Sequence, residues 1–218
     1  MPSLAAAIFG YLVLALAAAA MAVGAAGLFG NSLRRIVIFS GVLQGGYVGL
    51  AIAAGLVASS STGFAGAGFQ VIAAACGVWL MWIATRPIAA AAGDALPVRD
   101  DAELPAWAVF CFALACMSLV GLPPLAGLPA KIGVLRAGLR EPGVLFLTTL
   151  GAAALGAVSL WAYSGIVLRL IRVPTAKGAP DVTRGLRVLV DLLIAILIGL
   201  GLAPYIGFAL GAALAGGR

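Results

Sequence analysis

The sequence predicts an all-α protein that crosses a membrane about six times, organised as a single membrane domain over residues 1–218. Hydrophobic residues make up 64% of the 218 residues and charged residues only 9%, whereas soluble domains carry about 25% charged residues. The mean hydropathy is +1.19, and the apolar residues form runs of the ~20 residues that a membrane helix requires. In addition, a stretch rich in proline and glycine, residues 121–133, interrupts the fourth apolar run.

The first three spans are expected at residues 3–29, 36–59 and 64–85. No basic residue precedes the first run and no convincing cleavage site follows it, so we expect a membrane span there and not a signal peptide. A turn containing Arg34 and Arg35 separates the first two spans, and residues 59–63 form the next polar loop.

The fourth element, residues 105–139, is too long for one straight crossing, and we predict a helix broken at Gly121–Gly127. Each proline in this stretch removes a backbone donor and clashes with the preceding turn. The residues assigned to the break are Gly121, Pro123, Pro124, Gly127 and Pro129. In lipid, the carbonyl groups freed by such a break need partners from neighbouring helices or from water in a cavity.

The charges in the loops predict the orientation of the chain. The last two spans are expected at residues 144–171 and 188–214, and Pro204 marks a kink or a helix end. Nine basic residues fall in the loops after spans one, three and five: Arg34, Arg35, Arg86, Arg99, Arg169, Arg172, Lys177, Arg184 and Arg187. On the opposite side there are three: Arg136, Arg140 and Arg218. By the positive-inside rule, both termini lie outside the cytoplasm.

Lys131 follows the predicted break closely and lies inside the apolar fourth element. An ionisable group within a membrane span is costly, and such groups mark ion pathways and proton relays. Broken helices place polar backbone at membrane depth, where it lines such pathways. The alternative is a lysine near a helix end whose amine reaches the membrane surface along its aliphatic stem.

Four further polar side chains are candidates for orienting water on a proton pathway with Lys131: Gln44, Gln70, Ser159 and Tyr163. Each is also explained by hydrogen bonding between packed membrane helices, which contributes roughly 0.6 kcal/mol. The sequence has no histidine, the usual metal ligand and proton shuttle near neutral pH. The three cysteines, Cys76, Cys111 and Cys116, lie in apolar runs and are interpreted as core residues. We therefore expect no metal, no cofactor and no catalytic centre.

Three segments resemble motifs of a known family. Residues 30–47 read GNSLRRIVIFSGVLQGGY, which resembles a polar-basic turn followed by an aromatic residue with serines, then His or Gln and Gly-Tyr. Residues 121–131 read GLPPLAGLPAK, which resembles Gly-Ile-Pro-Pro-x-x-Gly-Phe-x-x-Lys, and residues 159–163 read SLWAY, which resembles a polar-aromatic motif. The family comprises the antiporter-like membrane subunits of respiratory complex I and their relatives in multisubunit cation/proton antiporters and membrane-bound hydrogenases. Within it, the chain most resembles subunit N of NADH:quinone oxidoreductase.

The resemblance implies a fold of one five-helix inverted repeat plus the last helix, with a central lysine, here Lys131, that takes up and releases a proton. The glutamate–lysine pair and the central lysine of the family's first repeat have no counterpart in this sequence. Gln44 stands where subunit N often has histidine, and Pro129 adds a proline before the lysine. The implied location is a bacterial cytoplasmic (inner) membrane. The implied partners are other membrane subunits, including a chain that supplies the missing first repeat.

Three functions are compatible with the sequence. The first, which we prefer, is a proton half-channel centred on Lys131 within a redox-driven or antiporter-type complex, such as one resembling NADH:quinone oxidoreductase. The second is a degenerate structural or assembly subunit that conducts no ions. The third is a small autonomous ion transporter that acts as an oligomer, since one inverted repeat can pair with a second copy. The motifs typical of a soluble enzyme, a phosphate loop, a metal cluster or a nucleophile–base pair, are missing from the sequence.

Overall fold

The computed structural model describes residues 4–58, 60–96, 102–176, 183–214 and 216. The regular elements of these ranges are the helices α1 Leu4–Gly27, α2 Leu33–Ala58, α3 Ser61–Ala92, α4 Ala106–Val120, α5 Gly127–Gly138, α6 Val144–Arg172, α7 Arg184–Leu202 and α8 Pro204–Leu214. Outside the described residues lie the basic residues Arg99, Lys177 and Arg218 and the predicted span ends at residues 3 and 59.

Five of these helices, α1, α2, α3, α6 and α7, are long and apolar enough to cross a membrane. This confirms the predicted class, a polytopic all-α membrane protein. The fourth predicted span is divided between α4 and α5, which have 15 and 12 residues. The last predicted span is also divided, because α7 ends at Leu202 and α8 begins at Pro204. Proline suits a first helical position, where its missing N–H would have no helical partner in any case.

Helix α3 is longer than predicted. It continues from the expected end at Thr85 to Ala92, with Pro87 inside it. The run of alanines that follows Pro87 favours helix, and the helix stops only at Gly93, which has φ +82°. The segment after Thr85, which we predicted to be loop, is therefore helical for one further stretch before the polar loop begins.

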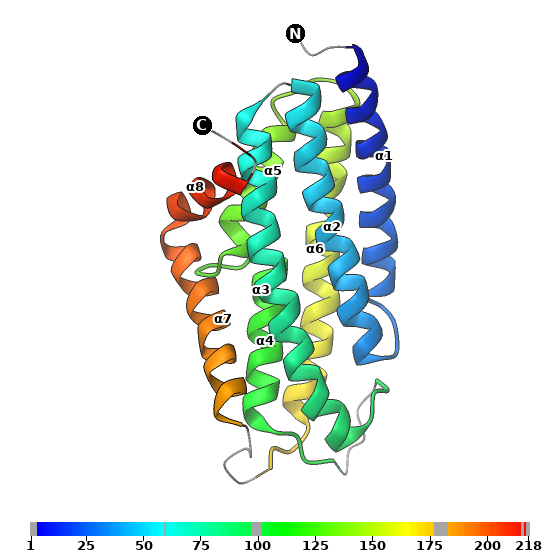
Figure 1. The fold of residues 1–218 in the computed structure, drawn as a ribbon. Coiled ribbons are helices and arrows are strands. Elements are labelled where there is room, and N and C mark those ends of the chain that lie inside the picture. The colour runs from blue at the N-terminus through cyan, green and yellow to red at the C-terminus, as the bar shows by residue number, and fades with distance from the viewer. Residues whose placement is uncertain (1–3, 59, 97–101, 177–182, 215, 217–218) are drawn as a thin grey trace.

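The helices form an elongated bundle, with most of them along its long axis and α8 inclined to it (Figure 1). Helix α3 is central, because it packs against α2, α4, α5, α7 and α8. Glycines allow the closest approaches. A Cβ on Gly24 of α1 would lie 2.5 Å from the Leu43 nitrogen of α2, and one on Gly68 of α3 would lie 2.5 Å from Gly211 Cα of α8. Lipid tails are as apolar as the helix surfaces, so the hydrophobic effect does not bring helices together within a membrane. Close backbone packing of this kind is therefore a main source of helix association.

The loops after α1, α3 and α6 meet at one end of the bundle, at the bottom in Figure 1. The Leu33 N–H donates to the Asp94 carbonyl at 2.9 Å, and the Leu96 N–H donates to the Asn31 carbonyl at 2.9 Å. The Leu104 N–H donates to the Pro174 carbonyl at 2.9 Å. The three loops to which the sequence assigned most of the basic residues thus share one side of the protein.

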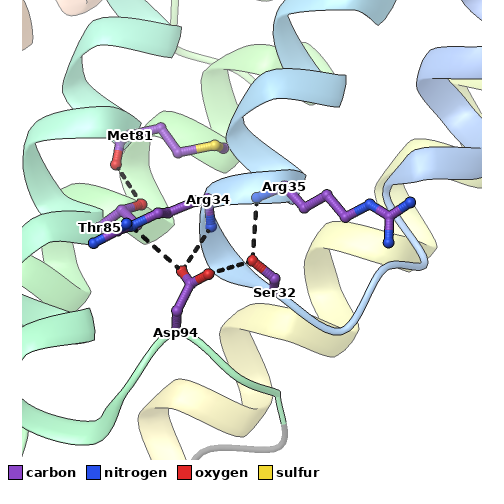
Figure 2. A network of polar contacts seen from close by, with 6 residues as sticks. All are labelled: Ser32, Arg34, Arg35, Met81, Thr85 and Asp94. Carbon is purple, nitrogen blue, oxygen red and sulfur yellow. Dashed lines mark hydrogen bonds and ion pairs between the residues drawn. The ribbon is translucent and has the colours of Figure 1, made fainter.

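The Asp94 side chain connects the loop after α3 to the loop after α1 and to the start of α2, as Figure 2 shows. Its Oδ1 accepts a hydrogen bond from the Arg34 N–H at 3.0 Å, and its Oδ2 accepts one from the Ser32 hydroxyl. The Ser32 oxygen in turn accepts from the Arg35 N–H at 3.4 Å. The carboxylate therefore satisfies an N–H of the first turn of α2 and lies at the positive end of that helix.

Replacing Asp94 with alanine is expected to destabilise the protein by about 1 kcal/mol, the usual cost of losing a helix cap. Thermal unfolding in detergent measures this change. The matched control is Arg34→Gln, which keeps the Arg34 N–H and removes only the exposed ion pair between Arg34 Nε and Asp94 Oδ1 at 3.9 Å. Because exposed ion pairs contribute little, this control should unfold like the wild type. Equal losses in both variants would contradict a capping role for the carboxylate.

Candidate functional site

The site is built on the break between α4 and α5. Helix α4 ends at Val120, and Gly121 adopts φ +95°. The Leu122 N–H donates to the Met117 carbonyl at 2.9 Å and the Gly121 N–H to the Ser118 carbonyl at 3.0 Å. This pair of bonds is the Schellman ending of a helix, which requires a left-handed residue and so favours glycine. It leaves the carbonyl groups of the last two helical residues, Leu119 and Val120, available to other donors.

Two close contacts hold the segment between the half-helices in place. A Cβ on Gly127, the first residue of α5, would collide with the Ser118 carbonyl oxygen, so glycine lets α5 start directly against α4. The Ala126 N–H donates to the Leu197 carbonyl of α7 at 2.7 Å. A backbone donor freed by the break therefore finds its partner in a neighbouring helix, as burial in a membrane requires.

The predicted break residues divide into two groups. Gly121, Pro123 and Pro124 lie in the non-helical segment, whereas Gly127 and Pro129 lie in the first turn of α5. Pro129 causes no interruption because N–H groups in the first turn have no partner within the helix. The interruption is thus shorter than the proline and glycine pattern suggested.

Lys131 projects from α5 back onto the end of α4. Its Nζ donates to the Leu119 carbonyl at 2.5 Å and to the Val120 carbonyl at 3.1 Å. The residue is only 6% exposed, so the amine is enclosed by protein, which argues against the alternative of a lysine that extends outward from a helix end. The negative end of the α4 dipole stabilises a cation in this position. At Gly121, a Cβ would lie 3.3 Å from Lys131 Cδ, so glycine also leaves room for the lysine stem.

Tyr47 of α2 provides the other wall of the lysine site. Lys131 Nζ lies 4.5 Å from the centroid of the Tyr47 ring, close enough for a cation–π interaction. The Tyr47 hydroxyl donates to the Ala152 carbonyl of α6 at 2.7 Å, which fixes the ring. Among the described residues, no carboxylate lies within ion-pair distance of Lys131. Carbonyl dipoles and an aromatic face therefore surround the amine.

Two of the predicted pathway residues join this site through a chain of hydrogen bonds. Gln44 Nε2 donates to the Leu119 carbonyl at 3.0 Å, so this oxygen accepts from both Gln44 and Lys131. Gln70 Nε2 donates to Gln44 Oε1 at 2.8 Å. Gln70 Oε1 is buried and has no partner in the described part of the chain. The chain of amides thus links α3, through α2, to the carbonyl that holds the lysine.

The other two predicted pathway residues make different contacts. The Tyr163 hydroxyl donates to the Ser40 hydroxyl at 2.7 Å, and Ser40 donates to the Ile36 carbonyl of its own helix at 2.7 Å. The Ser159 hydroxyl donates to the Leu155 carbonyl at 2.7 Å, one turn back in α6. In the part of the chain that the structure describes, neither residue hydrogen-bonds to Lys131, and their role on a pathway stays a prediction.

No protein-family model matches the sequence, but individual relatives do. A 112-residue segment is 36% identical to NADH-quinone oxidoreductase subunit N of Salinispora tropica, covering 47% of this chain and 22% of that protein. A 119-residue segment is 38% identical to NADH-quinone oxidoreductase subunit N 2 of Solidesulfovibrio magneticus, covering 51% of this chain and 24% of that protein. The matched part is therefore about a quarter of the length of these relatives.

The fold is similar to chains in three solved membrane complexes. One is an archaeal membrane-bound sulfane sulfur reductase (TM-score 0.73, 18% identity), where the match covers 95% of this chain and 42% of that one. The second is the Mrp complex of Dietzia sp. (TM-score 0.66, 16% identity), with 96% of this chain and 47% of that one covered. The third is respiratory complex I of Thermus thermophilus with bound NADH (TM-score 0.68, 19% identity), with 97% of this chain and 45% of that one covered. The resemblance to antiporter-like membrane subunits of complex I is thereby confirmed, and this chain spans less than half of each neighbouring chain.

Proposed function

We propose that the chain is a membrane subunit of a redox-driven or antiporter-type complex and contributes a proton half-channel centred on Lys131. The observation that carries the proposal is the buried amine held by two free backbone carbonyls at the end of a broken membrane helix. An ionisable group that a protein keeps at such a place at considerable cost is a functional group by default.

The geometry suits a group that gains and loses a proton without rearrangement. A protonated lysine has three N–H donors, and two of them bind the Leu119 and Val120 carbonyls. The third proton can leave without breaking either bond, since the neutral amine keeps two N–H groups. Among the described residues, no carboxylate lies beside the amine. Release of the proton therefore leaves no unpaired negative charge buried next to the neutral lysine.

In this mechanism Gln44 maintains the site in both states. When the amine becomes neutral, its bond to the Leu119 carbonyl weakens, because hydrogen bonds from charged donors are roughly twice as strong. The second donor on that oxygen, Gln44 Nε2, keeps the carbonyl satisfied. Gln70 orients the Gln44 side chain through its own donation to Oε1.

Replacing Gln44 with leucine is expected to slow proton transfer about fivefold without abolishing it, as one lost hydrogen bond corresponds to about 1 kcal/mol. The rate of proton movement into vesicles containing the assembled complex measures this. Gln70→Leu leaves the bond to Leu119 in place, and we expect a smaller decrease. A Gln70→Leu variant slower than Gln44→Leu would contradict the assigned order of the two amides.

The proposed assembly includes other membrane subunits, among them a chain that supplies the carboxylate and lysine of the family's first repeat. The relatives of this sequence are named as NADH-quinone oxidoreductase subunits, and the neighbours in fold come from multisubunit membrane complexes. We place the chain in a bacterial inner membrane, with the loops after α1, α3 and α6 in the cytoplasm and both termini on the other side.

The test is to purify the complex through a tag on this chain, identify its subunits and reconstitute it into vesicles. We expect co-purification with redox or antiporter subunits and proton movement coupled to their reaction. Isolation of the chain as a lone homodimer that moves ions would instead establish an autonomous transporter. A complex that assembles with it but moves protons equally well with Lys131→Ala would establish a structural subunit.

A further inference from the structure

A groove with two arginines lies at the end of the bundle opposite the loops after α1, α3 and α6. We call it the arginine groove. It has a volume of about 380 Å³, and its lining includes Thr62, Ala65, Gly133, Arg136, Arg140 and Phe208. These residues come from the start of α3, from α5 and the turn after it, and from α8. The groove therefore lies between the first turns of α3, the end of α5 and α8.

The inner part of the groove is apolar and closely packed. Phe208 of α8 packs edge-on against Phe69 of α3, with ring centroids 5.0 Å apart. A Cβ on Gly133 of α5 would lie 2.5 Å from the Phe208 ring, so the absence of a side chain lets α8 approach α5 here. Ala65 of α3 completes this apolar floor of the groove. These surfaces are compatible with a hydrocarbon chain and offer few polar partners.

The outer part of the groove is cationic. Arg136 and Arg140 are four residues apart, at the end of α5 and just beyond it, and both side chains are exposed. No carboxylate in the described ranges lies within ion-pair distance of either, since the one ion pair found there joins Arg34 and Asp94. The Thr62 hydroxyl lies in the first turn of α3, whose N-terminus adds a partial positive charge.

We propose that the arginine groove binds an anionic phospholipid. Arg136 and Arg140 bind the phosphate, which the planar guanidinium group matches with paired hydrogen bonds. An acyl chain of the same lipid lies along Ala65, Gly133 and Phe208. The combination of a cationic rim with an apolar floor selects a molecule that is anionic at one end and hydrocarbon at the other. This site does not depend on the proposed proton transfer at Lys131.

The test uses the delipidated complex and three additives: phosphatidylglycerol, phosphatidylcholine and inorganic phosphate. Binding is measured by native mass spectrometry and by the rise in Tm. We expect phosphatidylglycerol to bind and stabilise, and the other two to have little effect. The Arg136→Gln/Arg140→Gln variant should bind phosphatidylglycerol at least about tenfold more weakly, the effect of losing one charge-assisted hydrogen bond or more.

Two further variants separate this site from general attraction to charge. Arg172→Gln/Arg184→Gln removes two exposed arginines at the other end of the bundle and should bind phosphatidylglycerol like the wild type. Ala65→Leu fills the apolar floor and leaves both charges, so it should weaken lipid binding too. Equal binding by both double variants, undiminished binding by Ala65→Leu, or equal stabilisation by inorganic phosphate would each overturn the proposal.

Discussion

Replacing Lys131 with glutamine is expected to reduce proton transfer by the assembled complex at least about 10²-fold, the usual contribution of a positioned proton-transfer group. Glutamine is one side-chain atom shorter than lysine, but it keeps a neutral NH2 donor directed at the end of α4, where Lys131 Nζ binds the Leu119 and Val120 carbonyls. It cannot gain or lose a proton near neutral pH. We therefore expect the subunits to assemble normally, as measured by size-exclusion chromatography, while a pH-sensitive dye inside the vesicles reports no coupled proton movement.

Two companion variants sharpen this prediction. Lys131→Arg keeps a positive charge against the α4 carbonyls but does not deprotonate in proteins, so it should assemble and also fail to transfer protons. Arg172→Gln removes an exposed cation away from the site and should transfer protons like the wild type. Wild-type rates in both Lys131 variants would show that the amine has a structural role only, and the half-channel proposal would then be wrong.

The sequence was sufficient to predict the helix break and the lysine beside it. Dense proline and glycine leave few alternatives to an interruption, because they remove donors and demand unusual backbone angles. The partners of Lys131 could not be predicted, since they are backbone carbonyls of Leu119 and Val120. Every residue has a carbonyl group, so the side-chain sequence carries no mark of those that remain free.

The sequence indicated that these polar residues lie within the membrane spans, but not which neighbouring helix each side chain faces. Gln44 and Gln70 both face the site, whereas Tyr163 bonds Ser40 and Ser159 bonds its own helix. Which way each residue points depends on the rotation of its helix against its neighbours, and pattern alone does not determine that rotation in uniformly apolar helices. The arginines of the groove could be placed near the membrane surface, but their meeting with Phe208 of α8 required the three-dimensional fold.

Tyr47 was available to sequence reasoning and was not assigned to the site. It lies three residues after Gln44 in α2, a spacing that places two side chains on the same helix face. Once Gln44 was a candidate, Tyr47 should have been one too, and it is fully buried. A cation–π contact has no sequence motif, so helix spacing was the signal that could have identified it.

Replacing Gly201 with alanine is expected to destabilise the protein by about 3 kcal/mol or more, at the upper end of the cost of overpacking. A Cβ at this position of α7 would collide with the Pro124 carbonyl oxygen and lie 2.6 Å from the Leu125 carbonyl carbon. Both are backbone atoms, which cannot turn aside as a side chain can. Helix α7 must then move away from the break, which also strains the Ala126 N–H bond to the Leu197 carbonyl.

The matched control is Gly199→Ala, two residues earlier in the same helix, where a Cβ meets no atom within 4 Å. Alanine there should leave Tm unchanged or raise it, because alanine favours helix over glycine. Since α7 holds the segment that presents the Leu119 and Val120 carbonyls to Lys131, Gly201→Ala should also lower proton transfer in whatever complex assembles. Equal Tm values for the two variants would mean that the contact of α7 with the break adds nothing to stability, and the carbonyl pair would then be held by Gln44 of α2 and Lys131 of α5.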